Sequence, residues 1–422
     1  MAKDQLLGTA AARFGQAVGR EVRSRRQAFV DAGVEDLGFT AEDVADEVDR
    51  IADYLETSLE EDSRRWVAGR APICRAGQSA AIMFPSNGVC YGAADIARVV
   101  AAGNRVHGRN TGRAASISRL MQEVFDAVVP GRVNMELERS GPEFLTHALE
   151  SEDVPLLIAY GGEQLNDELL ERLPQGPAMR VVFEGPGKDP MIVLEGIDVD
   201  AVAADVVAAK FSRSGQRCDV PETFVVHASI HDALVDRLVD ACASAKVGDA
   251  THPDTVIAPI SSAKVPAAVA HQLADAVDRG AVVACGGKVD GQLVHPTVVT
   301  GVTSEMAIFQ DETFAPVFAV ARFEEEDEAV ELARATRYGL GCTVAGIRAE
   351  AVADRLRGAD YAEPIDAPVF GRFGTVELNR PANTETEDLV APFGGYGKSG
   401  FVWREGQLLQ GPKSFPHEAT RG

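Results

Sequence analysis

The chain has 422 residues, of which 45% are hydrophobic and 25% are charged, and its formal net charge is −23. This length is too great for one compact core, so we expect two or more domains. The negative charge argues against nucleic acid or an anionic membrane as a partner, because both would repel the chain.

Other global features indicate a reduced cytoplasmic protein. No apolar run reaches the roughly 18 residues that a membrane-spanning helix needs, and the N-terminal stretch lacks the apolar core of a signal peptide. The histidines do not cluster with one another or with cysteines, so we predict no metal site. The six cysteines are widely dispersed and form no C-x-x-C pair: Cys74, Cys90, Cys218, Cys242, Cys285 and Cys342.

The first part of the chain is predicted to hold helices and then a parallel sheet. Residues 1–70 have the periodicity of two or three amphipathic helices, which we interpret as a packed cap with a solvated acidic face. Residues 80–84 are a short apolar strand, and the following helix ends at Gly103-Asn104. Residues 107–113 are interpreted as a basic loop before a helix. Strand, Gly-Gly turn and helix follow over 154–173, and another strand ends in a glycine turn near 185. This alternation is typical of βαβ units with right-handed crossovers.

The pattern starts again after Cys218 and indicates a second α/β domain. Residues 222–245 are predicted as strand and helix, 265–287 as helix and strand, and 297–336 as strand, loop, strand and helix. The stretch from Ala391 is interpreted as a glycine-dense loop that crosses back to the first domain.

Candidate functional residues lie in four turns. Glu184 and Cys218 stand 34 positions apart in two glycine-containing turns, an arrangement suited to a base and a nucleophile. Asn87 lies in a Pro-Ser-Asn-Gly turn, and Gly161-Gly162 precedes a helix whose N-terminus could bind phosphate. Each feature alone has an ordinary explanation: Asn caps turns, Gly-Gly turns the chain in many proteins, and a lone Cys is often a small buried hydrophobe.

Together these turns resemble motifs of the aldehyde dehydrogenase superfamily. Residues 184–190 are similar to its E-L-G-G-K-x-P motif, with Pro186 replacing one glycine, and residues 215–218 are similar to its G-Q-x-C motif. Other segments along the chain are also similar to motifs of the family and occur in the family's order, at residues 85–87, 103–104, 159–162, 310–317, 338–340 and 392–400.

The resemblance implies two Rossmann-like parallel-sheet domains, preceded here by the N-terminal helical segment. A cofactor domain would comprise residues 1–183 and about 398–422, and a catalytic domain residues 184–397. It implies NAD(P)-dependent oxidation of an aldehyde to an acid through a thiohemiacetal and a thioester. Cys218 would be the nucleophile, Asn87 an oxyanion donor, and Glu184 the base that activates water and helps to deprotonate the thiol. Glu312 and Phe314 would hold the nicotinamide side of the cofactor, and Gly161 and Gly162 its phosphates.

Departures from the family pattern leave other functions open. Arg109 and Gly112 replace the lysine and glutamate that commonly grip the adenosine ribose, so NADP is at least as acceptable as NAD. Arg105 and Arg113 lie close by in sequence, although all three arginines could instead face solvent. Glu184 favours hydrolysis, but coenzyme A or a carrier thiol could replace water, and a silent scaffold that kept the fold is a third possibility. Since the chain has little room for the usual oligomerisation hairpin, we expect a homo-oligomer that is a dimer rather than a tetramer.

Overall fold

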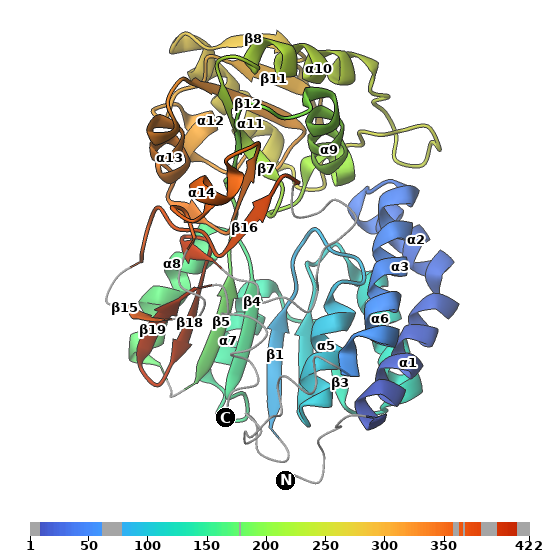
Figure 1. Cartoon of the computed structure of the whole chain (residues 1–422). Helices are drawn as coiled ribbons and strands as arrows, with labels where there is room; N and C mark the ends of the chain where they lie inside the picture. Colours follow the sequence, from blue (N-terminus) through green and yellow to red (C-terminus); the bar gives the residue numbers. More distant parts are fainter. Residues whose placement is uncertain are drawn as a thin grey trace.

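The computed structural model describes residues 9–60, 78–176, 179–357, 363–365, 368–380 and 395–411. Two β-sheets, each with helices on its faces, lie one above the other in Figure 1. The predicted alternation of strands and helices around parallel sheets is therefore confirmed. Among the described residues no helix combines the length and hydrophobicity needed to cross a membrane.

The first sheet has eight strands in the order β15-β19-β18-β5-β4-β1-β2-β3, of which β1 to β5 are mutually parallel. Its strands are β1 (Ser79–Met83), β2 (Arg105–Arg109), β3 (Val133–Met135), β4 (Leu156–Tyr160), β5 (Arg180–Glu184), β15 (Glu363–Ile365), β18 (Gly400–Arg404) and β19 (Gln407–Gln410). The connecting helices are α5 (Gly92–Ala101), α6 (Ala115–Val128), α7 (Gly141–Glu150) and α8 (Glu163–Arg172), the last followed by the 3-10 turn η2 (Leu173–Gln175).

The second sheet has seven strands in the order β16-β14-β6-β7-β12-β11-β8, and only β8 is antiparallel to its neighbour. Its strands are β6 (Asp189–Val193), β7 (Pro221–His227), β8 (Val282–Cys285), β11 (Thr297–Thr300), β12 (Val317–Phe323), β14 (Gly341–Ala345) and β16 (Thr375–Leu378). Its helices are α9 (Val199–Phe211), α10 (His231–Ser244), α11 (Lys264–Asp278), α12 (Ala307–Gln310), α13 (Glu326–Arg334) and α14 (Ala349–Ala353). Two short ladders pair β9 (Val289–Asp290) with β10 (Leu293–Val294), and β13 (Tyr338–Gly339) with β17 (Tyr396–Gly397).

The predicted N-terminal helices form a layer against α5 and α6, drawn in blue in Figure 1. They are α1 (Thr9–Ser24), α2 (Arg26–Ala32), a π-helical turn η1 (Gly33–Leu37) and α3 (Ala41–Thr57). Thr40 caps the N-terminus of α3, because its side chain accepts a hydrogen bond from the Asp43 N–H. Its apolar face, which includes Val44, Val48 and Ile51, is buried in the same core as the first sheet.

Two segments that we interpreted as loops, residues 107–113 and the stretch from Ala391, each contain part of a strand instead. Residues 105–109 form β2, in which Val106 and Gly108 are buried. A Cβ at Gly108 would lie 2.8 Å from the Phe84 ring, so the glycine serves close packing rather than a turn. In the C-terminal stretch, residues 400–404 form β18, which pairs antiparallel with β5 and sets Gly400 opposite Glu184. The expected return to the first sheet is thus made by β-pairing. The segment where we expected little room for a hairpin falls largely at residues 61–77, outside the described residues, as do Pro392 to Gly394 of the last motif.

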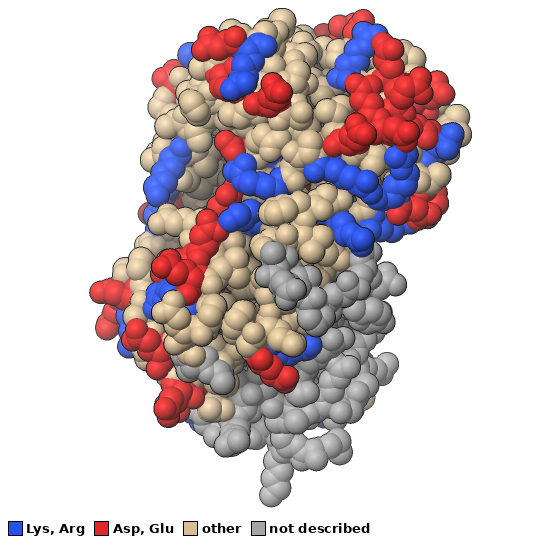
Figure 2. Space-filling model, turned by 90° about the vertical axis from the view of Figure 1, so that its left-hand side faces the viewer, with Lys and Arg blue, Asp and Glu red and all other residues tan. Residues whose placement is uncertain are grey.

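Charge is unevenly distributed over the surface. On the face shown in Figure 2, acidic side chains gather at the upper right, and a row of basic side chains crosses the middle of the molecule. Exposed arginines near α13 and α14 form ion pairs, such as Arg355 with Asp327 at 2.8 Å and Arg348 with Glu326 at 3.0 Å. Exposed pairs of this kind add little stability.

Candidate active site

A cavity of about 530 Å³ lies at the carboxyl ends of β1, β2, β4 and β5, where the first sheet faces the second. Open parallel sheets generally bind ligands at this edge. All eight site residues predicted from the sequence line the cavity: Asn87, Arg109, Gly161, Gly162, Glu184, Cys218, Glu312 and Phe314.

Cys218 is presented by a strained loop that follows α9. Within the 3-10 turn η3 (Ser212–Gly215), Arg213 and Ser214 adopt left-handed conformations with φ of 49° and 55°, and Gly215 follows with φ of 77°. A Cβ at Gly215 would lie 2.4 Å from the Ala315 carbonyl, so only glycine fits there. Such strain persists only where surrounding contacts impose it, and it occurs most often at functional sites.

The candidate acid lies directly beside the candidate nucleophile. The Cys218 Sγ is 3.9 Å from Glu184 Oε1, and Glu184 is 8% exposed. The two turns touch closely, because a Cβ at Gly187 would lie 1.9 Å from the Cys218 carbonyl oxygen. Burial raises the pKa of the Cys218 thiol well above its usual range, and the carboxylates of Asp219 and Glu184 raise it further.

Asn87 follows β1 in the turn that faces the cysteine loop. Its side-chain Nδ2 donates to the Gln216 carbonyl at 3.0 Å, and its own carbonyl accepts from Arg213 at 2.8 Å. The Asn87 side-chain amide is therefore bound to the residue that lies two positions before Cys218 in the sequence. Ser86, in the same turn, also lines the cavity.

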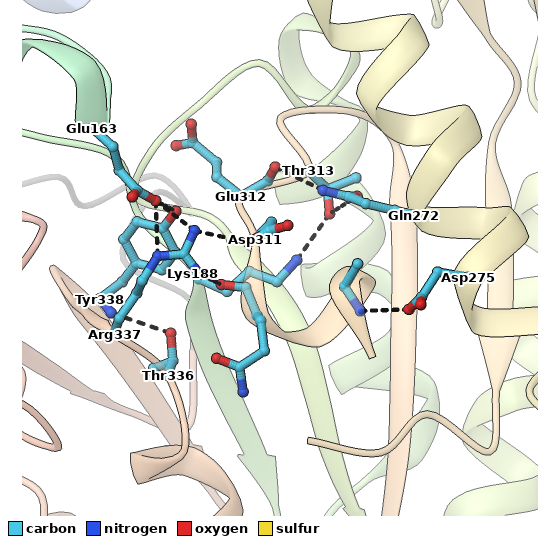
Figure 3. Close-up of polar contacts among 12 residues, drawn as sticks. Glu163, Lys188, Gln272, Asp275, Asp311, Glu312, Thr313, Thr336, Arg337 and Tyr338 are labelled. Atoms are coloured by element: carbon cyan, nitrogen blue, oxygen red, sulfur yellow. Dashed lines mark hydrogen bonds and ion pairs between the residues drawn. The ribbon is translucent and has the colours of Figure 1, made fainter. Parts of the chain in front are cut away.

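The loop that carries Glu312 and Phe314 is held by a buried ionic cluster, part of which is shown in Figure 3. Glu222 accepts hydrogen bonds from the backbone N–H groups of Thr313 and Phe314, each at 2.7 Å. Lys188 bridges Glu222 at 3.0 Å and the Thr313 hydroxyl at 2.8 Å, so it helps to position this loop. Burial raises the pKa of Glu222, but Lys188 and Lys210 outweigh it and keep the carboxyl ionised.

Glu312 itself has a perturbed acidity. Burial, together with the adjacent Glu222 carboxylate, raises the pKa of Glu312 to about 8. Its Oε1 accepts a hydrogen bond from the Gly187 N–H at 3.1 Å, which links it to the acid turn. A proton on this carboxyl would therefore be exchanged near neutral pH.

The Gly161-Gly162 turn connects β4 to the N-terminus of the ten-residue helix α8. A Cβ at Gly162 would meet no atom within 4 Å, so its backbone is open to the cavity. Glu163, the first residue of α8, is bound by Arg337 at 2.7 Å, and the same guanidinium contacts Asp311 at 2.7 Å. Figure 3 shows Arg337 lying between these two carboxylates. Arg337 thus joins the candidate phosphate turn to the Glu312 loop.

Of the three neighbouring arginines, only Arg109 lines the cavity. It ends β2 beside Gly112, and its Nε is buried without a hydrogen-bond partner among the described residues. Arg105 begins the same strand and is exposed, and Arg113 is also exposed.

Several supporting residues were missed by the sequence analysis. Arg337, Glu222 and the two α3 acids Asp43 and Glu47 reach the site loops from distant positions in the chain. A signal existed for Glu47, because it stands between Val44 and Val48 on the apolar face of its helix. No comparable signal marks Arg337.

Comparison with known proteins agrees with this architecture. Residues 11–410 match the sequence profile of the Aldehyde dehydrogenase family, and the chain belongs to that family. Succinate-semialdehyde dehydrogenase [NADP(+)] 1 of Mycobacterium tuberculosis (strain ATCC 25618 / H37Rv) is 39% identical over 223 residues, which are 52% of this chain and 46% of that protein. The similarity thus spans about half the length of this curated relative.

Solved structures share the fold. An NAD-dependent aldehyde dehydrogenase from Sinorhizobium meliloti superposes with a TM-score of 0.82 at 23% identity, covering 97% of this chain and 80% of that one. Glyceraldehyde-3-phosphate dehydrogenase GapN from Methanocaldococcus jannaschii, complexed with NADP, gives 0.79 at 20% identity, covering 93% and 85%.

Proposed function

We propose that the protein oxidises an aldehyde to a carboxylic acid with NAD or NADP through a covalent intermediate on Cys218. The observation that carries this proposal is the Cys218 thiol, 3.9 Å from the Glu184 carboxylate in a cavity that also holds Asn87 and Glu312. A nucleophile, a base and an amide donor around one cavity suit chemistry on a carbonyl group.

In the proposed first step the Cys218 thiol loses its proton to solvent, and the resulting thiolate adds to the aldehyde carbon. A C–S bond forms while the carbonyl π electrons move to oxygen. The Asn87 side-chain amide and the Cys218 backbone N–H would stabilise that oxyanion, and one such donor contributes roughly 3–4 kcal/mol. Loss of hydride from the same carbon then restores the C=O bond and leaves a thioester.

The proposed second step is hydrolysis. Glu184 accepts a proton from water while the water oxygen attacks the thioester carbonyl, and the C–S bond breaks to release the acid and the thiolate. Because an ionised carboxylate this close opposes formation of a thiolate, we assign Glu184 to this step rather than to activation of the thiol.

The cavity suits a nicotinamide dinucleotide, whose bound form supplies the hydride acceptor. The Gly161-Gly162 turn at the α8 N-terminus, whose backbone is open at Gly162, would bind the diphosphate. Glu312 and Phe314 would hold the nicotinamide ribose. The Nε of Arg109 has no partner within the described part of the chain and lies near Gly112, so it would favour a phosphate on the adenosine ribose, and NADP fits at least as well as NAD. Both NAD and NADP appear in the names of similar proteins and structures.

We propose the expected division of labour between the two sheets. Residues 1–183 and about 398–422 would bind the cofactor, and residues 184–397 would carry the nucleophile. We also propose a cytoplasmic homodimer without a nucleic-acid or membrane partner. Five described cysteines are free thiols, which suits a reducing compartment, and light scattering would measure the oligomeric state.

The test is calorimetric titration with NAD and NADP, followed by an aldehyde panel that includes succinate semialdehyde, named for the relatives. We expect one equivalent of free acid for each equivalent of reduced cofactor. If added coenzyme A yields an acyl-CoA faster than free acid forms, the second step is acyl transfer to a thiol rather than hydrolysis. Absence of cofactor binding at millimolar concentration would refute the proposal and support a silent scaffold.

A further inference from the structure

Two carboxylates of the N-terminal helix α3 reach into the loops of the candidate site. Glu47 is 1% exposed, and its Oε1 accepts from the backbone N–H groups of Val89, Cys90 and Tyr91 at 2.9, 2.8 and 2.7 Å. These groups lie between Asn87 and the start of α5. Asp43, one helical turn earlier, accepts from the Arg213 N–H at 2.9 Å and from the Ser212 hydroxyl at 3.1 Å.

Arg213 connects these acids to the oxyanion turn. Its guanidinium pairs with Glu47 Oε2 at 2.9 Å and donates to the Asn87 carbonyl at 2.8 Å. The residue is 6% exposed and has the strained left-handed backbone described above. A non-glycine residue in this conformation is disfavoured by about 1–3 kcal/mol, so its neighbours must hold it there. Asp43 holds its backbone, and Glu47 holds its side chain.

A closed ring of hydrogen bonds results. Asn87 Nδ2 donates to the Gln216 carbonyl at 3.0 Å, and Gln216 donates to the Arg213 carbonyl from its backbone N–H at 3.1 Å and its Nε2 at 3.0 Å. Arg213 completes the ring at the Asn87 carbonyl. The candidate oxyanion donor and the loop that ends in Cys218 are thus tied to each other, and α3 anchors the ring from outside.

We propose that Glu47 and Asp43 are positioning residues that fix the Asn87 amide relative to Cys218. The assignment of these two groups as donor and nucleophile rests on the proposed function. The N-terminal helices are then part of the active site rather than only a cap on the first sheet. Glu47 contributes through charge, because it faces three N–H donors at a helix start and one guanidinium.

Glu47→Gln tests the proposal, because it keeps the shape of the side chain and removes the charge. Glu56→Gln is the matched control, since Glu56 lies on the same helix and its carboxylate accepts from Arg23 at 3.1 Å, apart from the site loops. For each variant we would measure kcat, the cofactor dissociation constant, the melting temperature and the alkylation rate of Cys218 by iodoacetamide. The tryptic peptide of residues 218–237 contains Cys218 as its single cysteine, so mass spectrometry isolates that thiol.

Glu47→Gln is expected to lower kcat at least tenfold, about 1.4 kcal/mol, and to change the alkylation rate at least threefold. The cofactor dissociation constant should stay within twofold, and Glu56→Gln should leave all four quantities nearly unchanged. A lower melting temperature with unchanged kcat and alkylation would overturn the proposal, because Glu47 would then serve folding alone. If Glu47→Gln does not fold, Asp43→Asn takes its place with the same expected changes.

The alkylation measurement separates this proposal from the proposed function. A wild-type protein that oxidises no aldehyde refutes the function. Cys218 alkylation that depends on Glu47 and not on Glu56 would still support the anchoring of the loop.

Discussion

Replacement of Glu184 by glutamine should have opposite effects on the thiol and on turnover. Glutamine keeps the size of the side chain and removes the negative charge beside the Cys218 Sγ. Two unit charges 3.9 Å apart interact by about 4 kcal/mol at an effective dielectric constant of 20, and by about 1 kcal/mol in a water-like environment. Since one pKa unit corresponds to about 1.4 kcal/mol, the pKa of Cys218 should fall by about one to three units.

The assay is the pH profile of Cys218 alkylation, followed on the same tryptic peptide. In Glu184→Gln the midpoint should move to lower pH, and alkylation at pH 7 should be faster than in the wild type. Steady-state turnover should nevertheless fall by at least about 10²-fold after a burst of reduced cofactor, because the thioester would not be hydrolysed. An unchanged or higher midpoint would refute the electrostatic reasoning, and wild-type turnover without a burst would remove Glu184 from hydrolysis.

Three further predictions concern the cofactor loop and the contact between the two turns. Because the pKa of Glu312 is about 8 and the ionised carboxylate would bind ribose hydroxyls, cofactor affinity should rise about tenfold per pH unit up to pH 8 and then level off. Calorimetry should find no such slope in Glu312→Gln. Arg337→Met should raise the cofactor KM about fivefold or more, because it releases the phosphate turn from the Glu312 loop. The control is Arg334→Met, at an exposed position. Equal cofactor KM values for the two variants would show that Arg337 does not couple the turn to the loop. Gly187→Ala should lower kcat at least about tenfold, because its Cβ would displace the Cys218 carbonyl; an unchanged kcat would show that the turns can separate.

The same Glu312 carboxyl predicts a dependence of stability on pH. Its pKa is higher in the folded protein than the usual glutamate value, so the folded state holds a proton that the unfolded state has lost. Between about pH 4.5 and 8 the free energy of unfolding should therefore fall as pH rises. Thermal melts of wild type and Glu312→Gln would show this, because the variant should lose that contribution to the slope.

The parts of the fold that follow local rules could be predicted from the sequence. Apolar strands such as residues 156–160 and the helix that ends before Gly103 carry their own signals in periodicity and turn chemistry. Strand β2 could not be predicted this way. Its sequence, Arg-Val-His-Gly-Arg, is mostly polar, and its extended form depends on pairing with both β1 and β3.

The candidate site also contains residues with local sequence signals and residues whose roles depend on tertiary contacts. Glu184 and Cys218 lie in glycine turns that the sequence displays directly, and all eight proposed residues line one cavity. The residues that hold those turns depend on long-range packing. Arg337 meets Glu163 across 174 positions, and Arg213 meets Asn87 across 126. Glu47 was interpreted as part of a solvated acidic face, yet it is buried against the loops. Its place between Val44 and Val48 on the apolar face of α3 signals burial, but which loops it contacts is determined by the tertiary arrangement.

The most direct test of covalent oxidation at Cys218 is to trap the intermediate. Glu184→Gln would be mixed with an aldehyde substrate and oxidised cofactor, quenched in acid within the burst, and analysed by mass spectrometry of the peptide of residues 218–237. The account predicts that this peptide gains the mass of the acyl group as a thioester, in proportion to the reduced cofactor formed, and that Cys218→Ala yields neither. Reduced cofactor without an adduct on this peptide, or turnover by Cys218→Ala, would contradict it.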